Sequence, residues 1–155
     1  MKSLLLIALV STCFICSSSA QEMSGEPGYR FGLGVRLSNS TPTLNNSITG
    51  KYFVTNQNAV EGILSFGSRF GVGALLEIHK PTNIEGLRWF YGGGAYVGFE
   101  NSKTYLGPTG IIGIDYKFAN VPINLSVDYK PELDFLPEIN FVPDAFAFSV
   151  RFALK

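Results

Sequence analysis

The feature that most constrains this chain is the spacing of its apolar residues, which fall at every second position from Tyr29 onward. In residues 29–38, aromatic and aliphatic side chains alternate with arginine, glycine and serine. Successive side chains of a β-strand point to opposite faces, so a period of two predicts strands with one apolar and one polar face. We therefore expect an all-β fold.

Eight segments repeat this alternation, and clusters of Asn, Ser, Thr, Gly and Pro separate them. We expect strands near residues 29–38, 48–54, 60–66, 70–79, 87–100, 112–118, 123–130 and 146–154. The short connections are 55–58, 80–86 and 119–122, the longer ones are 39–47, 101–108 and 130–144, and a tight bend lies at Ser68–Arg69. This arrangement predicts an eight-stranded antiparallel up-and-down transmembrane β-barrel. The short connections and the N-terminus would then face the periplasm.

Alternation alone does not decide whether the apolar face lies outside or inside the barrel, but side-chain volume does. The interior of an eight-stranded barrel is just wide enough for side chains to fill. The apolar set is rich in Phe, Tyr, Ile and Leu, whereas the opposite set is mostly Gly, Ser and Ala with isolated charges. Charged residues make up only 15% of the chain, too few for an ordinary water-facing surface. We expect the apolar face to point outward, into lipid.

The first 20 residues have the pattern of a cleaved secretory signal, with Lys2, an apolar run at 4–15 and small residues before Gln21. The expected organisation is a signal peptide at 1–20, a short N-terminal segment at 21–28 and a barrel domain at 29–155. Both cysteines lie in the leader, so the mature chain would have no thiol. The 12 basic and 12 acidic residues cancel, which argues against nucleic acid as a partner.

The final hairpin resembles the small eight-stranded outer-membrane β-barrel proteins of Gram-negative bacteria. The resemblance rests on Val127-Asp128-Tyr129-Lys130-Pro131-Glu132 followed by residues 146–152, which end in Ser149-Val150-Arg151-Phe152. It covers the remaining mature chain only as a pattern of alternation. The resemblance implies a location in the cell outer membrane, contact with outer-membrane lipid, and recognition by the barrel-assembly machinery during biogenesis. It implies a location more than an activity.

Charged residues on the polar face should fill the lumen with ion pairs and hydrogen bonds, because so narrow a barrel leaves little room for a channel. The expected lumen residues are Arg30, Arg36, Lys51, Glu61, Arg69, Glu77, Arg88, Glu100, Asp115, Lys117, Asp128, Lys130 and Arg151. Aromatic residues near the strand ends should form two girdles at the bilayer interfaces. One girdle would contain Tyr29, Trp89, Tyr91, Tyr116, Phe118 and Phe152, and the other Phe66, Phe70, Phe99, Tyr129 and Phe146.

Catalytic and metal-binding residues are scarce. His79 is the only histidine, and its neighbours on the same face, Glu77 and Pro81, offer no nucleophile. One histidine and no mature cysteine argue against a metal site, and the glycines alternate within strands instead of forming a phosphate-binding loop. We expect neither catalysis nor a cofactor.

The 130–144 connection interleaves acidic and apolar residues, a combination that often marks a partner site. It would form a recognition surface for an extracellular partner, or it would pack over the barrel mouth or extend the final hairpin above the bilayer. The sequence thus predicts a monomeric outer-membrane barrel with a structural or surface-interaction role. Three alternatives stay open: a narrow porin-like channel for small solutes, a secreted lipocalin-like carrier of an apolar ligand, and an outer-membrane lipid-modifying enzyme.

Overall fold

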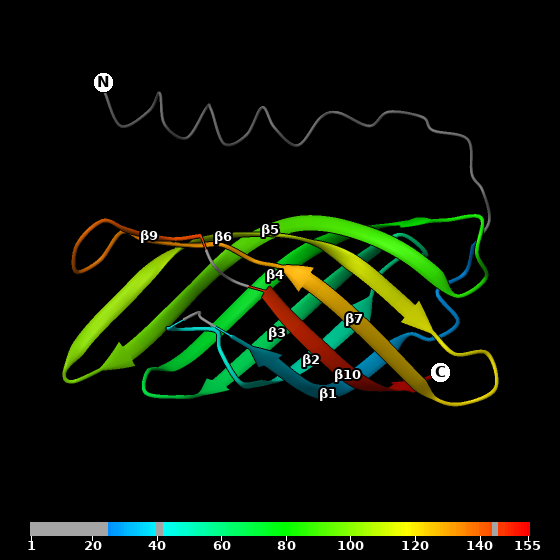
Figure 1. The fold of residues 1–155 in the computed structure, drawn as a ribbon, viewed down its shortest axis with the longest axis horizontal. Helices are drawn as coiled ribbons and strands as arrows, with labels where there is room; N and C mark the ends of the chain where they lie inside the picture. The colour runs from blue at the N-terminus through cyan, green and yellow to red at the C-terminus, as the bar shows by residue number, and fades with distance from the viewer. Residues whose placement is uncertain (1–24, 40–41, 144–145) are drawn as a thin grey trace, which may run out of the picture.

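The structure, a computed structural model, describes residues 25–39, 42–143 and 146–155. The expected signal peptide at 1–20, residues 21–24 and parts of two connections lie outside the described residues. Within the described ranges the secondary structure consists of ten β-strands (Figure 1). That part of the chain contains no helix of the length and apolarity needed to cross a membrane.

Eight strands form a closed barrel in which each strand is antiparallel to its neighbours. They are β1 (Phe31–Ser38), β2 (Ser47–Phe53), β3 (Asn58–Phe66), β4 (Phe70–Pro81), β5 (Leu87–Glu100), β6 (Lys103–Lys117), β7 (Ile123–Tyr129) and β10 (Phe146–Leu154). Strands β1 and β10 pair from Phe31↔Leu154 to Ser38↔Ala147 and thereby close the sheet. The predicted all-β, antiparallel, up-and-down eight-stranded barrel is confirmed.

The turn between β5 and β6 corrects the expected loop at 101–108. Only Asn101 and Ser102 form the turn, with φ angles of 48° and 62°, as a two-residue hairpin turn requires. The strand β6 begins at Lys103 and includes Gly107 and Pro108, which suggested a loop in the sequence. A Cβ at Gly107 would overlap the carbonyl oxygen of Leu133, so this glycine permits a close strand approach instead of a turn.

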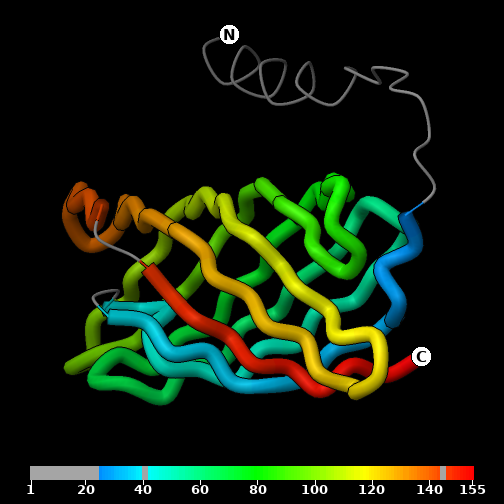
Figure 2. Tube along the Cα trace, turned by 45° about the vertical axis from the view of Figure 1, so that its right-hand side comes forward, coloured from blue at the N-terminus to red at the C-terminus, as the bar shows by residue number. Residues whose placement is uncertain are grey.

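The expected connection at 130–144 contains two short strands, β8 (Glu132–Asp134) and β9 (Asn140–Val142), which pair with each other. The strand β8 also pairs with β6 through Thr109↔Glu132. Figures 1 and 2 show this extension beside the β5–β6 hairpin, at the end of the barrel opposite the first described residues and the C-terminus. We call these two ends the outer end and the terminal end.

The two faces of the wall differ as the alternation predicts. On β1, Leu33 and Val35 are about half exposed, whereas Gly32 and Arg36 are buried. Across the described residues, 31 large hydrophobic side chains are exposed on the surface.

The phase prediction is wrong at the beginning of the first strand. Tyr29 is only 4% exposed and packs against Phe53, whereas Arg30 is exposed. The regular pairing of β1 begins at Phe31, so the two preceding residues are not held in the strand's alternation.

Candidate functional site in the barrel lumen

The lumen is filled by equal numbers of basic and acidic side chains. Among the described residues, six buried cations are Arg36, Lys51, Arg69, Arg88, Lys130 and Arg151, and six buried anions are Glu61, Glu77, Asp115, Asp128, Glu132 and Asp134. Each lies on the inward face of a strand or beside the mouth. Because charges removed from water must be paired, this equality in number allows the buried cations and anions to be paired with one another.

The middle of the lumen holds a network centred on two cations. Lys51 Nζ lies 2.8 Å from Glu77 Oε2 and 3.6 Å from Asp115 Oδ2. Arg151 forms an ion pair with Glu61 and donates to Ser126 Oγ at 2.7 Å.

Neighbouring strands supply the other contacts of this network. Asn124 Nδ2 donates to Asp115 Oδ1 at 2.6 Å, and Thr49 donates to Glu61. Arg36 makes a bidentate contact with Asp128, with both nitrogen–oxygen distances at 2.6 Å. The bidentate geometry is the strongest form of charge-assisted hydrogen bond between these groups.

An aromatic layer lies between this network and the terminal end. His79 is fully buried, stacks on Phe90 at a centroid distance of 4.8 Å, and meets the edge of Phe53. Its Nε2 lies 2.8 Å from Glu77 Oε2. The observed neighbours of His79 are thus two aromatic rings and a carboxylate, and the structure brings no hydroxyl nucleophile to it among the described contacts.

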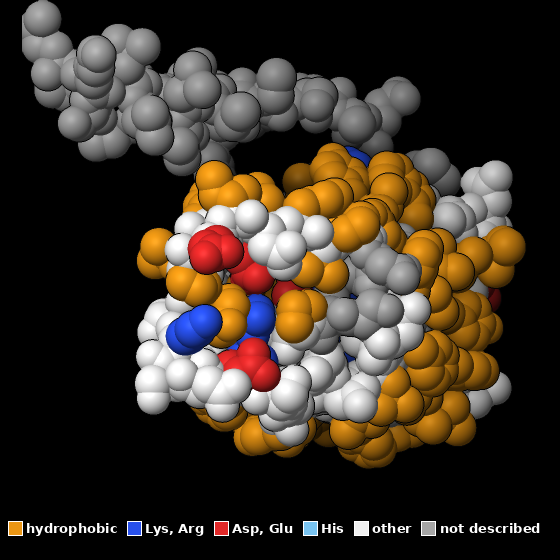
Figure 3. All heavy atoms as spheres, turned by 60° about the vertical axis from the view of Figure 1, so that its left-hand side comes forward, with side chains coloured by type: hydrophobic (Ala, Val, Ile, Leu, Met, Phe, Trp, Pro, Cys, Tyr) orange, Lys and Arg blue, Asp and Glu red, His pale blue; other side chains and the backbone are white. Residues whose placement is uncertain are grey.

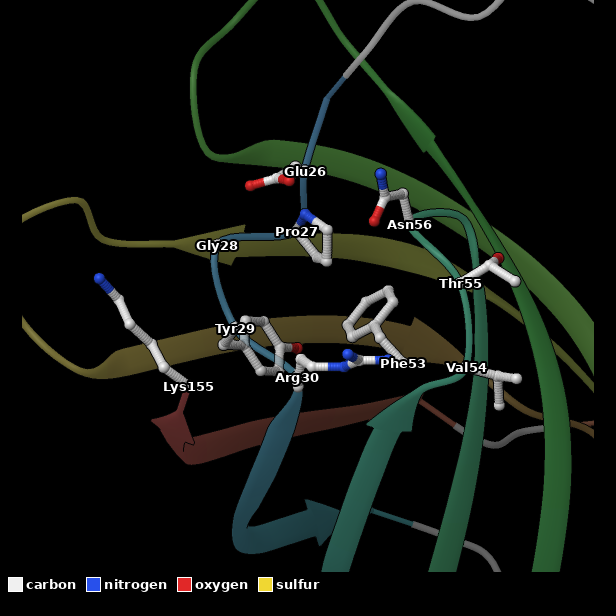
Figure 4. Close-up of a pocket in the computed structure, with 10 residues that line it drawn as sticks. All are labelled: Glu26, Pro27, Gly28, Tyr29, Arg30, Phe53, Val54, Thr55, Asn56 and Lys155. Carbon is white, nitrogen blue, oxygen red and sulfur yellow. The ribbon is translucent and has the colours of Figure 1, made fainter.

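Arg88 ties the terminal end to this layer. Its guanidinium donates to the carbonyl oxygens of Gly25 at 2.8 Å and Asn56 at 2.6 Å. At the same end, a cavity of about 520 Å³ opens between the 26–30 segment, the β2–β3 turn and Lys155 (Figure 4). Tyr29 and Phe53 lie at its inner side, so the aromatic layer separates this cavity from the charged network.

The outer mouth is occupied by the β1–β2 connection, which folds inward. Leu44 is fully buried in an apolar cluster with Ile63, Leu75, Phe90, Tyr96 and Ile111. Its backbone N–H donates to Glu132 Oε1 at 3.0 Å. Alternation does not predict this insertion. Gly73 leaves room for it, because a Cβ there would crowd the Leu44 side chain.

Arg69 joins all four outer connections. Its guanidinium donates to Thr43 Oγ1 at 2.7 Å, lies 3.5 Å from both Glu100 and Asp134, and stacks on the Tyr105 ring at 3.2 Å. Figure 3 shows charged side chains at this mouth and hydrophobic side chains covering the wall beside it. The β1–β2, β3–β4 and β5–β6 connections and β8 are thereby held as one unit.

Lys130 lies just beyond β7 and forms an ion pair with Glu132 at 3.1 Å. Burial lowers the pKa of Lys130 to about 8, although the carboxylate of Glu132 acts in the opposite direction. The sequence predicts Glu132 and Asp134 in an external loop, but both side chains are buried. The bend after Tyr129 turns them into the lumen, which alternation along β7 does not reveal.

The structure buries most of the charged residues that we expected in the lumen. Arg36, Lys51, Glu61, Glu77, Arg88, Asp115, Asp128 and Arg151 are buried, whereas Arg30 is exposed. Of the expected girdle residues, Trp89, Tyr91 and Phe152 are exposed, Tyr116, Phe118 and Tyr129 are half-buried, and Tyr29 points inward. Trp89 stacks on Tyr91, and Tyr129 packs on Phe146.

Within the described ranges, no group of three or more histidine, cysteine, aspartate or glutamate side chains could hold a metal ion. Comparison with protein-family models and with curated proteins finds no match for this chain.

Proposed function

We propose that this chain is an outer-membrane β-barrel protein with a lumen closed by side chains and a structural or surface-interaction role without catalysis. The observation that carries the proposal is the polarity of the wall: charged pairs lie inside and large hydrophobic side chains lie outside. This polarity is stable in lipid, because the transfer of apolar side chains from water into an apolar medium is favourable. A closed barrel also leaves few unpaired backbone groups to face hydrocarbon.

The same polarity argues against a carrier of an apolar ligand. Such a carrier needs an apolar cavity, whereas the middle of this lumen contains Lys51, Glu61, Glu77, Asp115 and Arg151. The side chains at the two ends of the lumen argue against a channel. The inserted Leu44 lies at the outer end, and the ring of Phe53 lies at the terminal end. A lipid-modifying enzyme would need His79 to contact a nucleophile and substrate, but it is packed between rings.

Cell fractionation with gel migration tests the location. The full chain, produced in a Gram-negative host, is expected in the outer-membrane fraction, and its unboiled band should migrate differently from its boiled band. A chain found in the aqueous fraction would contradict the proposal and favour the secreted carrier.

Planar-bilayer recordings test the closed lumen. We expect the refolded full chain to give no steady single-channel currents. The matched variant is Arg69→Ala, which removes the contact that joins the four outer connections. It tests whether loss of this contact opens the outer mouth. Steady large currents from the unmodified chain would overturn the closed lumen and favour the channel.

A further inference from the structure

Two cations, the exposed Arg30 and the half-buried Lys80, differ from the buried ones in their contacts. Each buried cation contacts a carboxylate or, for Arg88, two carbonyl oxygens. By contrast, Arg30 and Lys80 form no ion pair or side-chain hydrogen bond with any of the described residues. Both lie at the terminal end of the barrel.

The placement of Lys80 is specific. It lies directly opposite Trp89 in the β4–β5 pairing, and residues opposite each other in an antiparallel pair share one face. Its neighbour in sequence, His79, is buried in the lumen, so Lys80 is on the outward face. Trp89 is 41% exposed there and stacks on Tyr91. A lysine and a tryptophan at paired positions on an apolar wall suit the depth of lipid headgroups, where the lysine stem lies along the wall and its ammonium reaches the polar region.

The two ends differ in the charge that they leave accessible. Among the described residues, the outer end has Lys103 against Glu100 and Glu138 near the hairpin tips, whereas the terminal end has Arg30, Lys80, Lys117 and Lys155 against Glu26 and Glu85. Anionic headgroups would be attracted to the terminal end and not to the outer end.

We propose that the terminal rim binds the phosphate headgroups of anionic phospholipids, with Lys80 and Trp89 forming one contact and Arg30 another. This inference rests on the proposed function, since it assigns the terminal end to the leaflet that contains such lipids. Strands β1 and β4 are separated by β2 and β3, so Arg30 and Lys80 lie roughly 14 Å apart along the wall. They therefore contact different lipid molecules.

The single tryptophan of the chain allows a local test. The full chain is refolded into phosphatidylcholine vesicles that contain either brominated phosphatidylglycerol or brominated phosphatidylcholine, and quenching of Trp89 fluorescence gives the relative binding of the two lipids. We expect about a fivefold preference for phosphatidylglycerol, as one basic residue near an anionic surface provides. Lys80→Gln should reduce this ratio to about one.

Two matched variants locate the effect. Arg30→Gln removes a cation from the same rim but from a distant strand, and Lys103→Gln removes one from the outer end, so both should keep the preference measured at Trp89. Equal quenching by both lipids in the unmodified chain, or an unchanged ratio in Lys80→Gln, would overturn the inference alone. A Trp89 quenched by neither lipid would show that the chain does not insert, and would overturn the proposed function as well.

Discussion

The inner and outer faces of this barrel are made by the same eight strands, yet they obey opposite rules. On β10, Ser149 and Arg151 point inward and are buried, whereas Phe148 and Val150 point outward and are exposed. The inner face needs each charge to meet a partner, because water is excluded from it. The outer face needs only to be apolar, so its individual residues are more interchangeable. Substitutions on the two faces should therefore have different costs.

The largest effect is expected from breaking the central ion pair. Glu61→Gln leaves the Arg151 guanidinium without its carboxylate in the middle of the lumen, and should lower the free energy of unfolding by about 3–5 kcal/mol. Denaturant titration of the refolded barrel in lipid vesicles measures this change. Combining Glu61→Leu with Arg151→Met removes both charges and should recover much of the loss. An equal or greater loss in the double variant would contradict a pairing role.

A second prediction concerns Lys130 at the outer mouth. Its pKa of about 8 in the folded protein lies below that of an unfolded lysine. Between pH 8 and about 10.4, Lys130 is thus protonated in the unfolded chain but neutral in the folded protein, so the free energy of unfolding rises with pH. Below this window, the destabilisation caused by burying the charged Lys130 is complete. The expected gain is about 3 kcal/mol relative to Lys130→Gln measured at the same pH values. If the free energy of unfolding had the same pH dependence in the unmodified chain and in Lys130→Gln, this prediction would be contradicted.

On the outer face, the corresponding change is a charge placed on the wall that we propose faces lipid. Val35→Arg, on the exposed side of β1, should lower the free energy of unfolding in vesicles by about 2–3 kcal/mol, because the guanidinium must reach the headgroups. Val35→Leu is the apolar control and should change little. If Val35→Arg were neutral in vesicles, the outer wall would not face hydrocarbon.

The smallest expected difference compares two glycines on opposite faces. A Cβ at Gly34 would overlap the carbonyl oxygen of Val150 on the neighbouring strand, whereas at Gly62 the nearest atom would be 4.0 Å away. We expect Gly34→Ala to cost about 1–3 kcal/mol through overpacking and Gly62→Ala to stay within about 0.5 kcal/mol. The same denaturant titration distinguishes them, and equal costs would refute the difference in crowding.

The strands and the direction of their faces follow from the sequence because alternation is a local property. The charged side chains at Arg36, Glu61 and Arg151 could likewise be placed inside from their phase alone. Alternation does not predict the inward orientation of Tyr29, because this residue precedes the strand pairing that imposes alternation.

Tertiary contacts decide the remaining features. Leu44 enters the mouth because Gly73 leaves space for it, and Glu132 turns inward to meet Lys130 and the Leu44 backbone. Local patterning carries no information about such long-range contacts. The loop expected at 101–108 is wrong for a related reason: proline and glycine often mark loops, but here Gly107 permits β8 to approach β6.

The most direct test of the account is the chemical accessibility of the outer wall in a membrane. A cysteine introduced as Val150→Cys lies in the middle of β10, and Ile139→Cys, at a residue 81% exposed at the tip of the outer extension, is the control. In outer-membrane vesicles, a charged maleimide should label position 139 rapidly and position 150 only after the barrel is unfolded. Equally rapid labelling at both positions would contradict a lipid-facing wall.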